Sequence, residues 1–318
     1  MDIEINNLQK RKPVLKGYTL EELKDYFSAL GEKKKFISKI SSKLNGTTKY
    51  LFQTSDGYKI ESVVIPEINR TTLCVSTQVG CPLDCKFCAT GLMGYRRNLT
   101  SGEIFDQYKF AAIDYSSRQI KNIVYMGMGE PLLNFTETIR SVKIFAENLT
   151  PELRLRRITV STVGIAPKII DLADLDLKVK IAFSLHSCFE DIRTKLIPIN
   201  AKYSLKENLD AIHYYINKTG SRITFEYVMI DGINDREEDI HTLIKLCRSL
   251  PCKINVIPFN SLKHMNPKGF SAELRPSSQA RMNDFVKALR DKNIVVTVRF
   301  TAGDDIAAAC GQLAISEI

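Results

Sequence analysis

Three cysteines in one short segment are the residues best suited to chemistry. Cys81, Cys85 and Cys88 form a CxxxCxxC pattern, and the aromatic Phe87 directly precedes the last of them. In a reducing compartment, clustered cysteines bind metal or do redox chemistry more often than they form disulfides. Three thiolates can hold three irons of a [4Fe–4S] cluster, which usually has four cysteine ligands, and leave one iron open to a chelating substrate. A structural zinc ion needs four ligands, and only Cys74, on the preceding strand, is a nearby candidate. The spacing therefore predicts an iron–sulfur site.

Polar residues at predicted strand ends extend this interpretation. The segment Gly127-Met128-Gly129-Glu130-Pro131 follows a strand predicted over residues 123–128. Glycines let the backbone approach a ligand closely, and a carboxylate can accept hydrogen bonds from a bound ammonium group. Taken singly, such residues are more often satisfied turn or strand-end residues. Together with the cysteine loop, they predict a cofactor site that includes Gly129, Glu130, Ser161, Ser184, His186 and Asn260.

Strand-like and helix-like segments alternate from residue 71 onward. The predicted strands cover residues 71–77, 123–128, 157–163, 180–186, 223–230, 253–259 and 294–300. The predicted helices include residues 101–115, 136–147, 205–217, 236–248 and 277–292. Such alternation produces parallel βαβ units, so the sequence predicts an α/β protein with a partial or full barrel of six or seven units. Active sites of barrels form at the carboxyl ends of the strands, where the residues named above fall.

Residues 1–70 are predicted to form a separate small basic region. It holds 13 Lys and Arg against nine Asp and Glu, so it contributes +4 to the chain's net charge of +9. Thr19 and Glu22 fit the capping box of a helix that ends at Gly31. A hairpin is predicted from a strand at residues 50–53, a turn at Asp56-Gly57 and a strand at residues 59–65.

Composition argues against a membrane protein and favours a polyanionic partner. The chain has 318 residues, of which 44% are hydrophobic and 25% charged, ordinary values for a globular protein. No apolar run approaches the ~18 residues that span a bilayer, and the polar N-terminus lacks a signal-peptide core, so we expect a cytosolic location. The net charge and the pI of about 9.0 favour nucleic acid, although the same charge can serve solubility alone. The basic runs at residues 33–35 and 154–157 are each explained as simply by a solvated face.

The three-cysteine spacing resembles that of the radical S-adenosylmethionine (SAM) superfamily. Across residues 71–318 the chain is similar to the RNA methyltransferases that modify C2 of adenosine, the RlmN family. The matching segments are residues 73–81, 90–91, 97–100, 126–132, 158–164, 184–186 and 309–313. The related family that methylates C8 of the same adenosine shares most of these segments but typically has alanine where this chain has Pro131. The resemblance therefore favours C2.

This resemblance implies a site and a mechanism. It implies a partial (β/α)6 barrel, a [4Fe–4S] cluster on Cys81, Cys85 and Cys88, and two SAM molecules per turnover. Cys310 is similar to the cysteine that accepts a methyl group from one SAM, and the radical from the second SAM activates that methyl for addition to adenine. Cys74 would then form a transient disulfide with Cys310 and release the product, and Glu61 would be the proton acceptor. The implied cofactor-binding residues are Gly129, Glu130, Ser161, Ser184, Leu185, His186 and Asn260.

The resemblance also implies partners. The family substrates are a 23S rRNA adenosine at the peptidyl transferase centre and the adenosine 3′ to the tRNA anticodon, with a flavodoxin-type electron donor; we expect a monomer. Family members usually carry a longer helical region before the barrel. Here the stretch between residues 20–31 and 46–66 is shortened, which predicts a changed choice of RNA.

Three alternatives stay open at this point. They are a C8-type methyltransferase, a radical SAM enzyme that acts on another RNA or a peptide, and a non-enzymatic relative that binds RNA and keeps a structural cluster. Cys188, Cys247 and Cys252 match no role in any of these readings.

Overall fold

The computed structural model describes residues 35–68, 70–115, 120–148, 155–175, 177–299 and 302–315. The predicted helix over residues 20–31, its capping box and the lysines at 33 and 34 lie outside these residues. The described strands form one ten-stranded sheet, in the order β1-β2-β3-β4-β7-β8-β9-β10-β11-β12, and a small two-stranded sheet of β5 (Gln78–Gly80) and β6 (Tyr95–Asn98).

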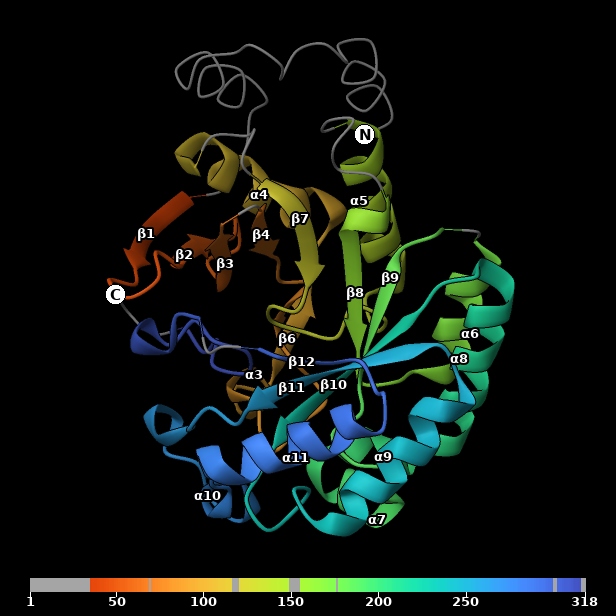
Figure 1. The fold of residues 1–318 in the computed structure, drawn as a ribbon. Coiled ribbons are helices and arrows are strands. Elements are labelled where there is room, and N and C mark those ends of the chain that lie inside the picture. Colours follow the sequence, from red (N-terminus) through yellow and green to blue (C-terminus); the bar gives the residue numbers. More distant parts are fainter. Residues whose placement is uncertain are drawn as a thin grey trace.

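Seven consecutive strands of the large sheet are parallel and form an open barrel (Figure 1). They are β4 (Arg70–Cys74), β7 (Ile120–Tyr125), β8 (Ile158–Thr162), β9 (Lys180–Ser184), β10 (Ile223–Met229), β11 (Cys252–Pro258) and β12 (Val296–Val298). The main connecting helices are α4 (Ser101–Tyr115), α5 (Phe135–Asn148), α6 (Ala166–Asp174), α8 (Leu205–Thr219), α9 (Glu237–Ser249) and α11 (Gln279–Asp291). Six βα units followed by a seventh strand confirm the α/β class and the partial (β/α)6 barrel.

Every strand and helix predicted from residue 71 onward is present, with ends that differ by a few residues. The largest differences are of three residues: β7 covers residues 120–125 rather than 123–128, and the first strand ends at Cys74 rather than at residue 77 because the chain leaves the sheet there. Residues 78–80 then pair with β6 instead and start the cysteine loop.

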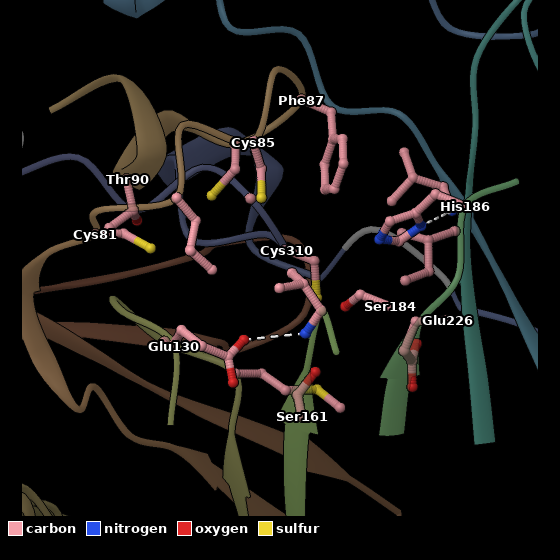
Figure 2. Close-up of a pocket in the computed structure, with 18 of the residues that line it drawn as sticks. Cys81, Cys85, Phe87, Thr90, Glu130, Ser161, Ser184, His186, Glu226 and Cys310 are labelled. Atoms are coloured by element: carbon pink, nitrogen blue, oxygen red, sulfur yellow. Dashed lines mark hydrogen bonds between the residues drawn. The ribbon is translucent and has the colours of Figure 1, made fainter. Parts of the chain in front are cut away.

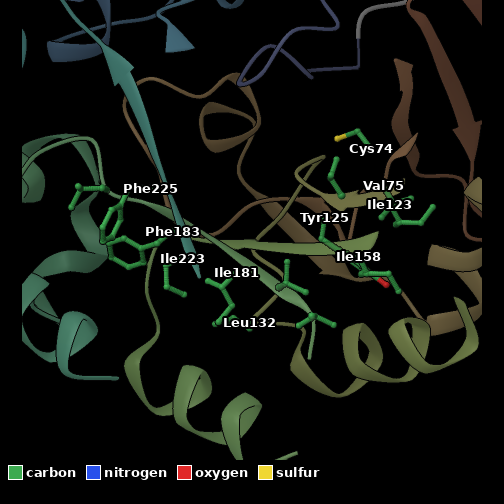
Figure 3. Close-up of a cluster of buried hydrophobic side chains, with 14 of the residues drawn as sticks. Cys74, Val75, Ile123, Tyr125, Leu132, Ile158, Ile181, Phe183, Ile223 and Phe225 are labelled. Atoms are coloured by element: carbon green, nitrogen blue, oxygen red, sulfur yellow. The ribbon is translucent and has the colours of Figure 1, made fainter. Parts of the chain in front are cut away.

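The parallel strands have an apolar outer face and an inner face on which polar side chains occur among apolar ones. In β10, Ile223, Phe225 and Tyr227 face the surrounding helices within the hydrophobic core, whereas Thr224 and Glu226 alternate with them and line a cavity. Figure 3 shows Phe225 beside Phe183 of β9, with helices packed against this outer face. Burying such side chains contributes about 1.5–3 kcal/mol each, so the outer layer holds the barrel together. The inner layer is left free to line a site.

The described part of the N-terminal region continues the barrel sheet. The strands β1 (Lys35–Ser41), β2 (Thr48–Gln53) and β3 (Lys59–Glu67) are antiparallel, and β3 pairs with β4 from Glu67↔Arg70 to Val63↔Cys74. The predicted hairpin is therefore confirmed, β1 is an additional strand, and these residues are not separate from the barrel. An RNA-binding role for residues 1–70 stays a prediction.

Of the partial and full barrels that the sequence allows, the described residues form the partial one, and its first and last strands are not neighbours. β12 pairs only with β11, and the second edge of β4 is taken by β3. The C-terminal tail lies on this open side, against the hairpin and the cysteine loop (Figure 1). Within the described ranges, every helix is too short or too polar to cross a membrane.

Arg193, in α7 (Glu190–Leu196), ties the carboxyl ends of two barrel strands together. Its guanidinium is fully buried and donates hydrogen bonds to the carbonyls of Ser184 (3.0 Å), Leu185 (3.1 Å) and Val163. A further bond goes to the side-chain oxygen of Asn200. Because a buried cation is tolerated only when its donors are satisfied, this network sets the ends of β8 and β9.

We expect Arg193→Met to lower the free energy of unfolding by about 3–5 kcal/mol, because it leaves several buried acceptors without a donor. Arg140→Met is the matched control, since Arg140 forms an exposed 2.7 Å ion pair with Glu137 on α5. That change should cost less than about 1 kcal/mol. Urea unfolding of both variants measures the difference, and equal losses would contradict the role given to Arg193.

Candidate active site

A cavity with about 900 Å³ of empty space, part of it open to solvent, lies at the carboxyl ends of the barrel strands (Figure 2). We call it the upper cavity. Most of the sequence-predicted site residues meet there. They are Cys81, Cys85, Cys88, Gly129, Glu130, Ser161, Ser184, His186, Asn260 and Cys310.

The three cysteines of the CxxxCxxC segment face this cavity from one loop. Burial and, to a smaller extent, neighbouring cysteines raise the pKa of Cys81 to about 12 and raise that of Cys85 well above its usual value. Within the described ranges, no three metal-ligating side chains converge tightly enough to hold a single ion. A single zinc ion needs ligands that meet at one point, whereas a multi-iron cluster takes one thiolate at each of several irons. The three thiols around this cavity therefore suit a cluster better. Iron binding would also remove the need to keep buried thiols protonated.

Two glycines of the 127–131 segment are required by close backbone packing. A Cβ at Gly127 would lie 2.7 Å from the carbonyl oxygen of Val75. At Gly129, where φ is +98°, a Cβ would lie 2.5 Å from the Gln78 side chain. Neither position can accept a larger residue without a shift of β4 or of the loop after it. Because these two glycines lack a Cβ, the segment after β7 packs closely against the segment that leads into the cysteine loop.

Glu130 is held at the floor of the upper cavity as a buried carboxyl group. Its side chain accepts 3.0 Å hydrogen bonds from the N–H groups of Leu132 and Val163, and its own N–H donates to Gln78 at 2.8 Å. Burial raises its pKa to about 7 in spite of these bonds. A carboxylate has about four acceptor positions, so an ammonium group in the cavity can still bind there and would favour the ionised form.

His186 is neutral and oriented. Burial, and secondarily the charge of Arg193, lowers its pKa to about 3. The Val228 N–H donates to Nδ1 at 3.0 Å, so in this neutral ring the proton lies on Nε2. The ring of Phe87 packs edge-on against it with a centroid distance of 4.5 Å. The aromatic residue before the last cysteine thus connects the cysteine loop to the end of β9.

Cys310 is brought to the barrel by the C-terminal tail. The Asn260 side chain donates to its carbonyl at 3.0 Å, and the N–H of Ala89 donates to the carbonyl of Gly311 at 2.7 Å. Cys74, at the end of β4, is 8% exposed, and both cysteines are free thiols. Burial and, to a smaller extent, the nearby charge of Cys310 raise the pKa of Cys74 to about 12. The two predicted partners therefore lie near each other, through the tail and not through strand pairing.

Three predicted residues lie outside the upper cavity: Cys74, described above, Leu185 and Glu61. Leu185 is fully buried in the core and touches the site only through its backbone, whose N–H donates to the Glu226 carbonyl at 3.0 Å. Glu61 is fully buried, pairs with Lys49 at 3.1 Å and accepts a 3.1 Å hydrogen bond from the Ala314 N–H. A strand pattern cannot show such pairing, because the tail that completes it is remote in sequence.

Sequence reasoning missed two charged residues that line the cavity wall. Arg299 lies next to Cys310, Glu226 and Cys74, and the charges of these groups raise its pKa. Glu226 is a buried carboxyl group whose Oε1 accepts a 2.9 Å hydrogen bond from Asn255. A lone carboxylate inside the otherwise apolar run of β10 was the available signal, because an ionisable group in a core strand needs a functional or structural reason.

Comparison with known proteins agrees with this geometry. The model of the radical SAM superfamily matches residues 75–244. A radical SAM methyltransferase from Sphaerobacter thermophilus, known from its crystal structure, is 39% identical with a TM-score of 0.85, over 97% of this chain and 92% of that one. The open barrel and the three-cysteine loop are thus those of a radical SAM protein.

Curated relatives identify the family within this superfamily. One from Thermotoga maritima, named probable dual-specificity RNA methyltransferase RlmN, is 42% identical over 315 residues, which is 99% of this chain and 87% of the relative. Another of the same name from Flavobacterium psychrophilum is 43% identical over 279 residues, covering 86% of this chain and 78% of the relative. This chain belongs to the RlmN family of dual-specificity RNA methyltransferases.

The neutral state of His186 gives a stability that depends on pH. With a pKa lowered to about 3, the folded protein leaves His186 unprotonated, whereas the unfolded chain protonates it below about pH 6.5. Stability is therefore lost as the pH falls below 6.5. Between pH 7 and pH 5 the wild type should lose about 2 kcal/mol more than His186→Gln. Denaturant unfolding of reduced, cluster-free protein at both pH values measures this difference, and parallel losses would refute it.

Proposed function

We propose that the protein methylates C2 of adenosine in 23S rRNA at the peptidyl transferase centre, and in tRNA at the adenosine 3′ to the anticodon. The observation that carries this proposal is the joint placement of the three-cysteine loop, Cys310 and Cys74 around one barrel, in a chain 42% identical to a named RlmN relative. A binding protein has no need of two further thiols beside a cluster site.

Different residues of the upper cavity would bind the cluster and SAM. Cys81, Cys85 and Cys88 would hold a [4Fe–4S] cluster, which when bound supplies the single electron that reductive cleavage of SAM requires. Glu130 would receive the ammonium group of SAM. Ser161, Ser184, His186 and Asn260 line the remaining wall and would fix its orientation.

Cys310 and Cys74 carry the covalent steps. The Cys310 thiolate would attack the methyl carbon of a first SAM, forming an S–CH3 bond while the bond to the sulfonium sulfur breaks and S-adenosylhomocysteine leaves. After the activated methyl carbon has joined C2 of adenine, the Cys74 thiolate would attack the Cys310 sulfur. An S–S bond then forms, and the S–C bond breaks with its electron pair passing to the product. The side chain of Arg299, next to both thiols, would favour the ionised form of Cys74.

Glu61 stays in the proposal as the acceptor of the C2 proton, a role within the ordinary range of a positioned carboxylate. In the described residues it also anchors the tail that carries Cys310. Lys49, its ion-pair partner, donates to the Ala307 carbonyl at 3.4 Å, while Glu61 itself receives the Ala314 N–H. The buried pair thus holds the tail on both sides of Cys310, and proton transfer would require the pair to open.

The family resemblance adds partners to the proposal. They are a flavodoxin-type electron donor and two SAM molecules per turnover, with a monomer acting in the cytoplasm, where rRNA and tRNA occur. The flat target base has to leave its stack to reach Cys310, which suits RNA segments with unpaired bases.

Mass spectrometry of the reconstituted protein and of RNA digested after reaction tests the function. We expect a methyl group on Cys310 and 2-methyladenosine in rRNA and tRNA, resolved by chromatography from the 8-methyl isomer. The 8-methyl product would assign the protein to the C8 chemistry. An unmethylated Cys310 with unchanged RNA, while SAM is still cleaved, would refute the proposal.

Replacement of each thiol should stop the reaction at a different stage. Cys310→Ala should show neither a methylated protein nor methylated RNA. Cys74→Ala should keep the methyl group on Cys310 and accumulate a covalent protein–RNA adduct, visible on a denaturing gel. Cys247→Ala is the matched control, because Cys247 is a free thiol on the outer helix α9 and should leave both products unchanged. Product release by Cys74→Ala at the wild-type rate would exclude the disulfide step.

Glu61→Gln separates proton transfer from anchoring. The Gln side chain can still accept the Ala314 N–H bond but cannot take a proton, so Cys310 should still be methylated while RNA methylation falls about 100-fold or more. Both products are quantified from the same reaction. A parallel fall of Cys310 methylation and RNA methylation would leave Glu61 only its anchoring role.

A further inference from the structure

A second, larger cavity lies within the barrel, towards the amino ends of its strands. It has about 1920 Å³ of empty space, part of it open to solvent, and we call it the lower cavity. Its walls are inward-facing residues early in their strands, such as Thr72, Thr159 and Thr224, and the start of each strand forms its rim. Cys74 lines this space, but no step of the chemistry proposed above uses its rim or the strand starts that line it.

The two cavities meet at Cys310. Six residues line both of them: Met126, Glu226, Ile257, Asn260, Arg299 and Cys310. Cys74 lines the lower cavity only. Cys310, which would carry the methyl group, thus lies between the upper cavity and the lower cavity. The lower cavity is large enough for a nucleotide. Figure 2 shows Cys310 between the cysteine loop and the side chains of Ser184, at the end of β9, and Glu226, in β10.

The rim of the lower cavity is strongly cationic. Arg157 and Lys180 are exposed and Lys253 is partly buried, and among the described residues none of the three has an ion-pair partner. Arg70 adds a fourth cation, although Glu67 pairs with it. Burial lowers the pKa of Lys180, and the nearby charges of Lys253 and Arg157 lower it further. Like charges gathered at a mouth repel one another, so an anion bound there would be stabilised.

The wall between the rim and Cys310 carries polar side chains among apolar ones such as Val124 and Ile257. Closed α/β barrels fill their interior with branched apolar side chains, whereas Asn122, Asn255 and Glu226 face this one. Two buried polar atoms of this wall, Nδ2 of Asn122 and Oε2 of Glu226, have no hydrogen-bond partner. A buried donor and a buried acceptor left open cost free energy unless a ligand satisfies them. Adenine offers both an N–H2 donor and ring-nitrogen acceptors, and asparagine is a common partner for it.

We propose that the lower cavity is the site of the target nucleotide: a single-stranded RNA segment lies with its phosphates on Arg157, Lys180 and Lys253, and its extruded adenine reaches Cys310 along the wall of Asn122, Asn255 and Glu226. This inference rests on the proposed function and adds the entry side and the binding residues. It places RNA and SAM on opposite sides of Cys310. An acidic protein segment is the competing occupant of the rim.

The test uses the holoenzyme and a labelled RNA hairpin with the target adenosine in its loop. Lys180→Gln together with Lys253→Gln should weaken hairpin binding at least tenfold and lower the slope of log Kd against log salt by about 1.4, the value for two phosphate contacts on a single strand. Lys206→Gln with Lys218→Gln removes the same charge from the exposed face of α8 and is the matched control. It should change neither quantity.

Two further measurements keep the result interpretable. Lys180→Arg with Lys253→Arg keeps the charge and should bind the hairpin like the wild type. Methylation of Cys310 by SAM without RNA reports on the upper cavity independently. The inference is overturned if the Gln pair binds RNA with the affinity and salt slope of the control pair, or if the Arg pair loses binding as the Gln pair does. If poly-glutamate displaces the hairpin and binds the protein as tightly as the hairpin does, the rim is instead assigned to an acidic protein.

Failure of this inference differs from failure of the proposed function. If RNA enters elsewhere, the wild type still forms 2-methyladenosine and the Gln pair does so with unchanged KM. If the function itself is different, the wild type forms no methylated adenosine in the first place.

Discussion

The position of the C-terminal tail is the constraint on which the site depends. The parallel strands do not close into a ring, because β3 occupies the edge of β4 that β12 would need. The tail lies on the open side, and hydrogen bonds tie it to three different elements. Lys49 and Glu61 bind it from the hairpin, Thr90 donates to the Leu313 carbonyl at 2.7 Å from the helix after the cysteine loop, and Asn260 binds it from the end of β11. Cys310 is fixed between these attachments.

The buried pair of Lys49 and Glu61 is a costly way to hold a tail. Taking two charges out of water is compensated only when their geometry is good and their remaining hydrogen-bonding capacity is used. Both conditions are met by backbone groups of the tail itself, Ala307 and Ala314. The pair and the tail are therefore mutually dependent: without the tail the pair would lose partners, and without the pair the tail would lose its attachment to the sheet.

The two faces of each barrel strand have different functions: the outer face stabilises the fold, and the inner face lines the site. The outer face supplies the hydrophobic energy through residues such as Phe183 and Phe225, and helices cover it. The inner face carries polar side chains and lines the two cavities, so its residues lack the close packing of a hydrophobic core. The cost of this arrangement is reduced by networks such as that of Arg193 at the upper end. At the lower end Arg157, Lys180 and Lys253 have no ion-pair partner among the described residues, which is a reason to look for a ligand there.

The local sequence determined much of this protein. Cysteine spacing predicted the cluster loop, and two-residue and 3.6-residue periodicities predicted the barrel elements, because these features depend only on neighbouring residues. The polar strand ends at Ser161, Ser184 and His186 followed from strand assignment. What only the tertiary structure decided is how remote segments meet: Glu61 with Lys49 and the tail, Cys310 with Cys74 through the tail, and Arg299 with both thiols. The same applies to the two cavities, since a cavity is made by side chains from seven strands whose spacing no single segment encodes.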